Sequence, residues 1–154
     1  MAFVIGMAKA LNRIGRLQQA IDELGTLPRR VAEVAAPQIT KLLRRQFTTG
    51  TDPYGRRYKR VTAETLRRRI SKGKGPPLTD TGKGKAGTVA RLMPGGRKGV
   101  RIMLGRPELY FSQVGTRTQP VRKVFPDQGI PAAWREVLSR AARSEFKRIM
   151  RRAG

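Results

Sequence analysis

The chain is organised around FTTGTDPYGRRYKRVTAETLRRRISKGKGPPLTDTGKGKAG, residues 47–87. The run Asp52-Pro53-Tyr54-Gly55 within it has the composition of a tight turn. An Asp side chain bonds to the backbone ahead of it, Pro presets φ at the second turn position, and Gly tolerates a left-handed exit. We therefore predict a turn here, with Tyr58 as an aromatic anchor directly after it.

The second half of this stretch predicts a short helix followed by a hinge. Thr62 is a suitable N-cap for a helix that runs to about Lys72. Pro76-Pro77 cannot lie inside a helix, so the chain leaves extended. We expect residues 72–87, which are rich in Gly and Lys, to form a flexible hinge. Gly82-x-Gly84-x-x-Gly87 has the spacing of a phosphate-binding loop, but it lacks the preceding strand and the following helix that such loops need.

Composition limits the classes of protein to which the chain can belong. A length of 154 residues predicts one domain with a modest core. The hydrophobic content of 38% and the aromatic content of 6% are low, so we expect part of the apolar surface to be buried against partners. The absence of Cys excludes disulfides and thiolate metal sites, and the absence of His removes the commonest general base.

The charge is the extreme feature of the composition. Lys and Arg number 34 against 10 Asp and Glu, which gives a net charge of +24 at pH 7. Such a chain is attracted to polyanions. Two interpretations remain open: contact with nucleic acid, and a basic surface that faces an acidic neighbour in an assembly. No apolar run approaches the ~20 residues of a membrane-spanning helix, so we predict no spanning segment and synthesis in the cytosol. The basic C-terminal helix could alternatively lie on an anionic membrane, but Arg135, Ser139 and Arg143 interrupt its apolar face, so we predict no membrane partner.

The N-terminal part, residues 1–47, predicts helices. Gly25 is placed to end the first helix, Pro28 to begin the second, and Pro37 to kink or split the second. The first helix carries a narrow apolar stripe with near-heptad spacing. Packing of this stripe on its own domain is the preferred interpretation, and an oligomer contact is the alternative. The stripe consists of Met7, Leu11, Ile14, Leu17, Ile21 and Leu24.

The rest of the chain predicts a small sheet and a long terminal helix. Thr88–Met93 and Val100–Leu104 read as the two strands of a hairpin, with Glu108–Val114 as a third candidate strand. Residues 115–130 read as a loop with an extended piece at Val121–Phe125. Pro131 opens a last helix that runs to about Arg152 and contains Trp134 as a core anchor. The predicted fold class is α+β, with N-terminal helices, a small central antiparallel sheet and a long C-terminal helix. It forms one domain, divided into 1–47, 48–87, 88–130 and 131–152.

Catalytic patterns are weak. The acids are scattered, and a backbone-bonding role is the simpler explanation for Asp52 and Asp80. A hydrolase or two-metal nuclease built on Asp52, Asp80 or Glu64 is the enzymatic alternative. We predict no catalytic activity, no cofactor and no metal site.

The order of several motifs resembles the phage virion morphogenesis or tail-completion proteins, which are small neck components at the head–tail junction. The shared pattern is a Phe that ends a helix, an Asp-Pro-x-Gly turn, an aromatic residue, a Thr-rich helix start and a Pro-Leu-x-x-Thr-Gly segment. A segment that looks like the family's Tyr…Gln-Phe-Gly and a Pro-x-Arg before a Phe follow. Here these are Phe47, Asp52, Pro53, Gly55, Tyr58, Thr62, Thr65, Pro77, Leu78, Thr81, Gly82, Tyr110–Gly115 and Pro120-Val121-Arg122. The chain departs from the family at Gly84, where Leu is usual, and at Tyr58, where Trp is usual.

The resemblance covers roughly residues 40–150 and implies a structural virion protein that completes the tail or joins it to the DNA-filled head. It implies a ring, with a hexamer expected, that contacts head–tail adaptor or portal-side proteins and tail-tube or terminator proteins. Assembly in the host cytoplasm and non-specific contact with packaged DNA are further expectations. A basic, sequence-independent nucleic-acid-binding protein is the alternative. The candidate interaction residues are Asp52, Pro53, Gly55, Arg56, Arg57, Tyr58, Lys59 and Arg60.

Overall fold

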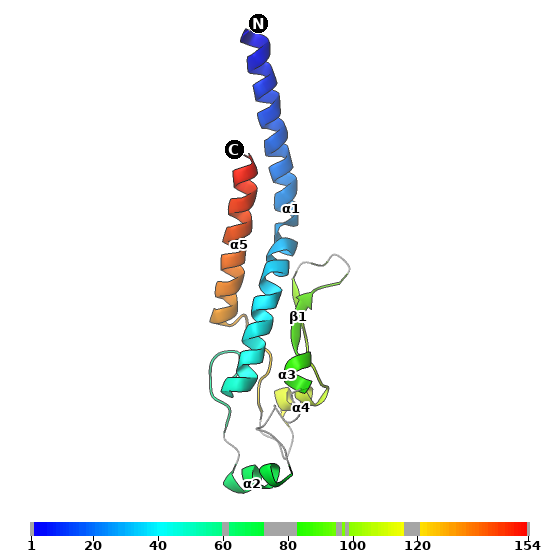
Figure 1. Cartoon of the computed structure of the whole chain (residues 1–154), viewed down its shortest axis with the longest axis vertical. Helices are drawn as coiled ribbons and strands as arrows, with labels where there is room; N and C mark the ends of the chain where they lie inside the picture. Colours follow the sequence, from blue (N-terminus) through cyan, green and yellow to red (C-terminus); the bar gives the residue numbers. More distant parts are fainter. Residues whose placement is uncertain are drawn as a thin grey trace.

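Two long antiparallel helices form the body of the molecule, and a small hairpin and short helices lie beside them (Figure 1). The computed structural model describes residues 2–59, 62–72, 83–94, 97, 99–115 and 121–153, with side chains from residue 10 onward except at positions 83, 84, 108 and 111. This architecture confirms the predicted α+β class. The elements in chain order are α1 (Ala2–Thr49), α2 (Ala63–Ser71), α3 (Lys83–Gly87), β1 (Val89–Leu92), β2 (Val100–Met103), α4 (Glu108–Val114) and α5 (Ala132–Ala153).

Helix α1 is continuous over 48 residues, so the prediction of separate N-terminal helices is wrong. The helix passes through Gly25, Pro28 and Pro37 without ending. An internal proline removes one hydrogen bond and costs about 3 kcal/mol. Packing on both sides of the prolines offsets this cost, because α5 runs alongside this part of α1. Both prolines are exposed.

Two apolar clusters hold α1 against α5. Near the C-terminal end of α5, Ala20 packs with Ile149 and Ala153. The larger cluster joins the second half of α1 to the start of α5 and to β1. Its buried members are Ala35, Ala36, Ile39, Leu43, Ala90, Trp134 and Ala141, so the prediction of Trp134 as a core anchor is confirmed.

The N-terminal part of α1 extends beyond the end of α5 (Figure 1). Its apolar stripe was predicted to pack on its own domain, and this is wrong for four of its members. Leu11, Ile14, Leu17 and Ile21 are between 47% and 67% exposed. In this part of α1 it is Ala20, rather than the neighbouring Ile21, that packs with Ile149 and Ala153 of α5.

The hairpin is confirmed, and Thr40 bonds it to α1 beside the apolar contact of Ala90. Strands β1 and β2 are antiparallel, with Val89 opposite Met103 and Leu92 opposite Val100. Thr40 Oγ1 donates to the Ala36 carbonyl at 2.9 Å and accepts from the Ala90 amide at 2.9 Å. This bond satisfies the backbone of β1 on its α1 side and fixes the distance between sheet and helix.

The third candidate strand is instead the helix α4, so that part of the prediction is wrong. Pro107 suits the first turn of a helix, and its carbonyl accepts from the Tyr110 amide at 2.9 Å. Leu109 and Gln113 are both buried, four residues apart. This is the helical period, whereas the apolar alternation in the sequence indicated a strand. The central region therefore holds fewer strands than predicted.

Two further local predictions concern the cap of α2 and the hinge that follows it. Thr62 caps α2, where its Oγ1 accepts from the Thr65 amide at 3.3 Å. The end of the expected hinge is helical, because residues 83–87 form α3. The side chain of Arg44 donates to the Ala86 carbonyl at 3.0 Å, which holds α3 on α1. The remainder of that hinge, residues 73–82, lies outside the described residues.

The substitution of Ala for Gly25 and for Gly87 tests two of these findings: the continuous helix α1 and the helix α3 at the end of the hinge. Gly25→Ala should raise the free energy of unfolding by about 1 kcal/mol, because nothing lies within 4 Å of the added Cβ in a continuous helix. Gly87→Ala should lower it by about 1–3 kcal/mol, because its Cβ would lie 2.7 Å from Gly105 Cα. Urea denaturation of both variants measures the two changes. A destabilising Gly25→Ala would argue against the continuous helix.

Candidate functional site

The candidate site is the turn that follows α1, and the Asp52 side chain builds it. Asp52 Oδ1 accepts from the Tyr54 amide at 2.9 Å and from the Arg56 amide at 2.8 Å. The Gly55 amide donates to the Asp52 carbonyl at 3.0 Å, and Gly55 has a φ of 86°, which favours glycine. The predicted turn is confirmed, with the carboxylate used internally rather than presented to a partner.

The turn closes back on the end of α1. The Tyr58 amide donates to the Gly50 carbonyl at 2.8 Å, and a single β-bridge joins Thr51 to Arg57. Gly50 has a φ of 67° and donates to the Gln46 carbonyl at 2.9 Å, which is a common helix ending. The exit of the chain from α1 is thus fixed by backbone bonds.

Two tyrosines of the turn connect it to the loop before α5. The Tyr58 hydroxyl donates to the Lys123 carbonyl at 2.6 Å. The Tyr54 hydroxyl accepts from the Gln128 amide at 2.6 Å and from the Asp127 amide at 3.1 Å. Segments about 70 residues apart in sequence are therefore joined by specific bonds, and Tyr58 is the anchor predicted from sequence.

Helix α4 completes this junction from the other side. Gln113 Oε1 accepts from the Val124 amide at 2.7 Å, and its Nε2 donates to the Phe125 carbonyl at 3.0 Å. Phe47, Leu109 and Val124 form the buried cluster beneath these bonds. We call this arrangement of Phe47, Tyr58, Leu109, Gln113 and Val124 the junction.

The electrostatics of the junction favour an un-ionised phenol. Burial raises the pKa of Tyr58 well above its usual value, and the negative charge of Asp52 raises it further. The charge of Arg122 acts in the opposite direction. Burial also lowers the pKa of Arg122, with the charge of Arg69 as the second cause. Tyr58 is therefore a hydrogen-bond donor at physiological pH, which its bond to Lys123 requires.

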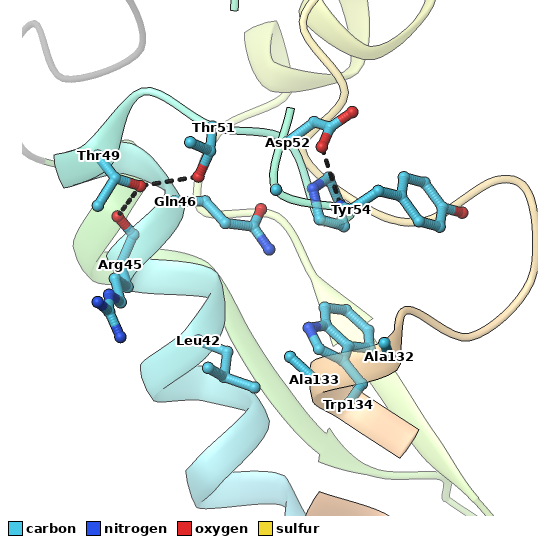
Figure 2. A pocket seen from close by; sticks show the side chains of 12 residues that line it. Leu42, Arg45, Gln46, Thr49, Thr51, Asp52, Tyr54, Ala132, Ala133 and Trp134 are labelled. Atoms are coloured by element: carbon cyan, nitrogen blue, oxygen red, sulfur yellow. Dashed lines mark hydrogen bonds between the residues drawn. The ribbon is translucent and has the colours of Figure 1, made fainter. Parts of the chain in front are cut away.

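A pocket of about 440 Å³ lies between the turn and the first residues of α5 (Figure 2). The Gln46 side chain lies in it between the turn and Trp134, and Asp52 and Ala133 also line it. Gln46 is 7% exposed, and its Oε1 is buried without a hydrogen-bond partner. A buried polar atom without a partner costs free energy, so Gln46 lowers the stability of the folded chain at this point.

The structure divides the predicted interaction residues into two groups. Asp52 and Pro53 are buried and Tyr58 is half-buried, so these three maintain the turn. Gly55, Arg56, Arg57 and Lys59 are exposed around it. Arg60 lies outside the described residues. The exposed members are those available to a partner.

The side of the pocket opposite the turn was not predicted from the sequence. Ala132, Ala133 and Trp134 lie about 80 residues from the turn, and no local pattern connects them to it. Gln46 was not predicted as a pocket residue either. Its sequence position could have indicated it, because it is a polar residue on a helix face that also carries Leu43 and Phe47, both buried.

Tyr58 gives a pH-dependent test of the junction. Its pKa is higher in the folded chain than the ordinary value of about 10 that the unfolded chain has. Above pH 10 the Tyr58 hydroxyl loses its proton in the unfolded chain but keeps it in the folded chain. The free energy of unfolding should therefore fall as the pH rises. Tyr58→Phe should flatten this fall and, at neutral pH, lower the free energy of unfolding by about 1 kcal/mol through the lost bond.

Urea denaturation between pH 8 and pH 11 measures both effects. Tyr110→Phe is the control, because Tyr110 is 55% exposed, and this variant should keep most of the alkaline fall. If the free energy of unfolding fell equally with pH in Tyr58→Phe and in the wild type, Tyr58 would not be the cause of the fall.

Within the described residues, no group of three or more Asp, Glu, His or Cys is placed to hold a metal ion. No helix in the same ranges is both long and apolar enough to cross a membrane. No protein-family model, curated protein or solved structure matches the chain, so its function is argued from its residues and geometry.

Proposed function

We propose that this chain is a structural protein of the phage neck that completes the tail or joins it to the DNA-filled head as part of a ring. The observation that carries the proposal is the junction. Phe47, Tyr58 and Gln113 belong to motifs of the resemblance that are dispersed over more than 60 positions, yet they meet in one bonded unit. Motifs that converge in space support a common structural origin better than a chance order along the chain.

The turn is the part of this unit that meets a neighbouring neck protein. Its backbone is held by Asp52 and by the bonds of Tyr54 and Tyr58, so it is a preorganised surface and loses little entropy on binding. The adjacent pocket receives a side chain of that neighbour, between the turn and Trp134. The surrounding cations, Arg56, Arg57 and Lys59, favour an acidic partner surface. No reaction is assigned to the site.

Particles made from a genome that lacks this gene test the proposal directly. We expect electron microscopy to show filled heads beside separate or malformed tails. Complementation with Ala133→Trp should give the same defect, because the new indole fills the pocket from an exposed position in the first turn of α5. Ala63→Trp, at an exposed alanine in the first turn of α2, is the matched control and should restore normal particles. Normal infectious virions from the deleted genome would overturn the proposal.

The net charge of +24 and the exposed cations around the turn support nucleic-acid binding as the second candidate function. Each phosphate neutralised adds about 0.9 to the slope of log affinity against log salt for duplex DNA. A variant with Arg56, Arg57 and Lys59 changed to Gln separates the two functions. We expect its slope to match that of a control with Gln at Arg143, Lys147 and Arg151, which are exposed on α5. A selective loss of about 2–3 from the slope in the turn variant would favour DNA contact at the turn.

A further inference from the structure

The outer face of the hairpin carries two arginines that lie directly opposite each other. Ala90 and Ile102 are paired across the strands and pack in the apolar cluster with α1. Because side chains alternate between the two faces of a strand, the next pair, Arg91 and Arg101, lies on the face turned away from α1. Both arginines are exposed, and Figure 1 shows β1 along the side of α1. We call the outer face formed by Arg91 and Arg101 the basic face.

The two arginines of the basic face have no counter-charge in the part of the chain that the structure describes. Neither Arg91 nor Arg101 makes an ion pair or a side-chain hydrogen bond there. By contrast, the exposed Arg29 and Arg140 each pair with a glutamate one turn away, at 3.3 Å and 2.6 Å. Like charges directly opposite each other on two strands destabilise a sheet. An anion bound from outside would relieve this repulsion.

The composition of the surrounding segment selects the class of anion. From Lys83 to Pro107 the sequence contains seven Lys and Arg residues and no Asp, Glu, Phe, Tyr or Trp. Interfaces between proteins are enriched in aromatic side chains, whereas interfaces with DNA are more polar and much more positively charged. Single-stranded nucleic acid is bound by stacking its bases on aromatic side chains, which this segment does not offer. The segment therefore favours the phosphates of a duplex.

We propose that the basic face binds the phosphate backbone of duplex DNA without sequence preference. Arginine suits this contact, because its planar guanidinium donates two parallel hydrogen bonds to a phosphate. The Cβ atoms of opposite residues on two strands lie about 5 Å apart, so Arg91 and Arg101 contact the same stretch of backbone. The hydrogen bond between Thr40 and the Ala90 amide holds β1 on α1, so the basic face is preorganised.

This inference goes beyond the proposed neck role, because it assigns a second surface and a different partner. The turn meets an acidic protein, whereas the basic face contacts DNA. The test uses purified protein, so it and the particle experiment can fail separately. A neck defect in particles without DNA binding by the purified chain would remove the basic face as a site. Normal virions from the deleted genome, with DNA binding intact, would remove the neck role alone.

Anisotropy of a short fluorescein-labelled DNA duplex, titrated with the full chain over a series of salt concentrations, tests the basic face. Arg91→Gln with Arg101→Gln should reduce the slope of log affinity against log salt by about 2, at about 0.9 per phosphate. The control, Arg143→Gln with Arg151→Gln, removes two exposed arginines of α5 and should keep the wild-type slope. Arg91→Lys with Arg101→Lys retains both charges and should also keep that slope.

Urea denaturation separates DNA contact from a structural role of the two arginines. The Gln variant of the basic face should unfold at a higher urea concentration than the wild type, because the opposed charges are gone. A lower urea midpoint with an unchanged salt slope would make the pair structural and overturn the proposal.

Three binding results would also overturn the proposal. The first is an equal loss of slope in the basic-face variant and the α5 control, which would mean that DNA contact is spread over the whole surface. The second is tighter binding of the wild type to a single strand than to a duplex of the same length. The third is a basic-face variant that loses binding to polyglutamate but not to DNA, which would make the partner an acidic protein.

Discussion

The structure depends on the packing of α1 against α5, two helices of very different length. At 1.5 Å per residue, α1 is about 72 Å long and α5 about 33 Å long. Where they pack, burial of Ala35, Ile39 and Leu43 keeps α1 helical through Pro37. In the described residues, the apolar side chains of α1 from Leu11 to Ile21 that belong to the stripe are exposed.

The end of α1 is the second organising constraint. The helix stops at Gly50, and Asp52 bends the chain with two backbone hydrogen bonds to its side chain. From there Tyr58 and Gln113 hold the loop that leads into α5. This loop also positions Trp134, which packs on α1 in the larger apolar cluster. The loop therefore connects the turn to that cluster. A partner bound at the turn would thus contact a rigid part of the molecule.

The chain combines a strongly basic composition with exposed apolar side chains. A net charge of +24 opposes association of copies through long-range repulsion. Apolar side chains of the stripe between Leu11 and Ile21 are nevertheless exposed on α1, and Arg56, Arg57 and Lys59 are exposed around the turn.

Local features were determined by the sequence itself. Thr62 as a cap, Pro131 before α5, Trp134 in the core, the hairpin and the Asp52 turn all follow from short-range chemistry, and each is present. The candidate site was half predictable: the turn was found, but its opposite wall at Ala133 and the unpartnered Gln46 were not, because only folding brings them together.

The remaining outcomes were decided by tertiary structure. Pro28 and Pro37 indicated breaks in a helix, and contact with α5 on both sides of them overrode that preference. Leu109 and Gln113 became neighbours on a helix because Phe47 and the backbone at Val124 were present to bury and bond them. The stripe from Leu11 to Ile21 was visible in the sequence, but only the structure showed that its side chains are exposed in the folded chain. A local pattern specifies which residues need a partner, and only the arrangement of the whole chain determines whether that partner is supplied from within it.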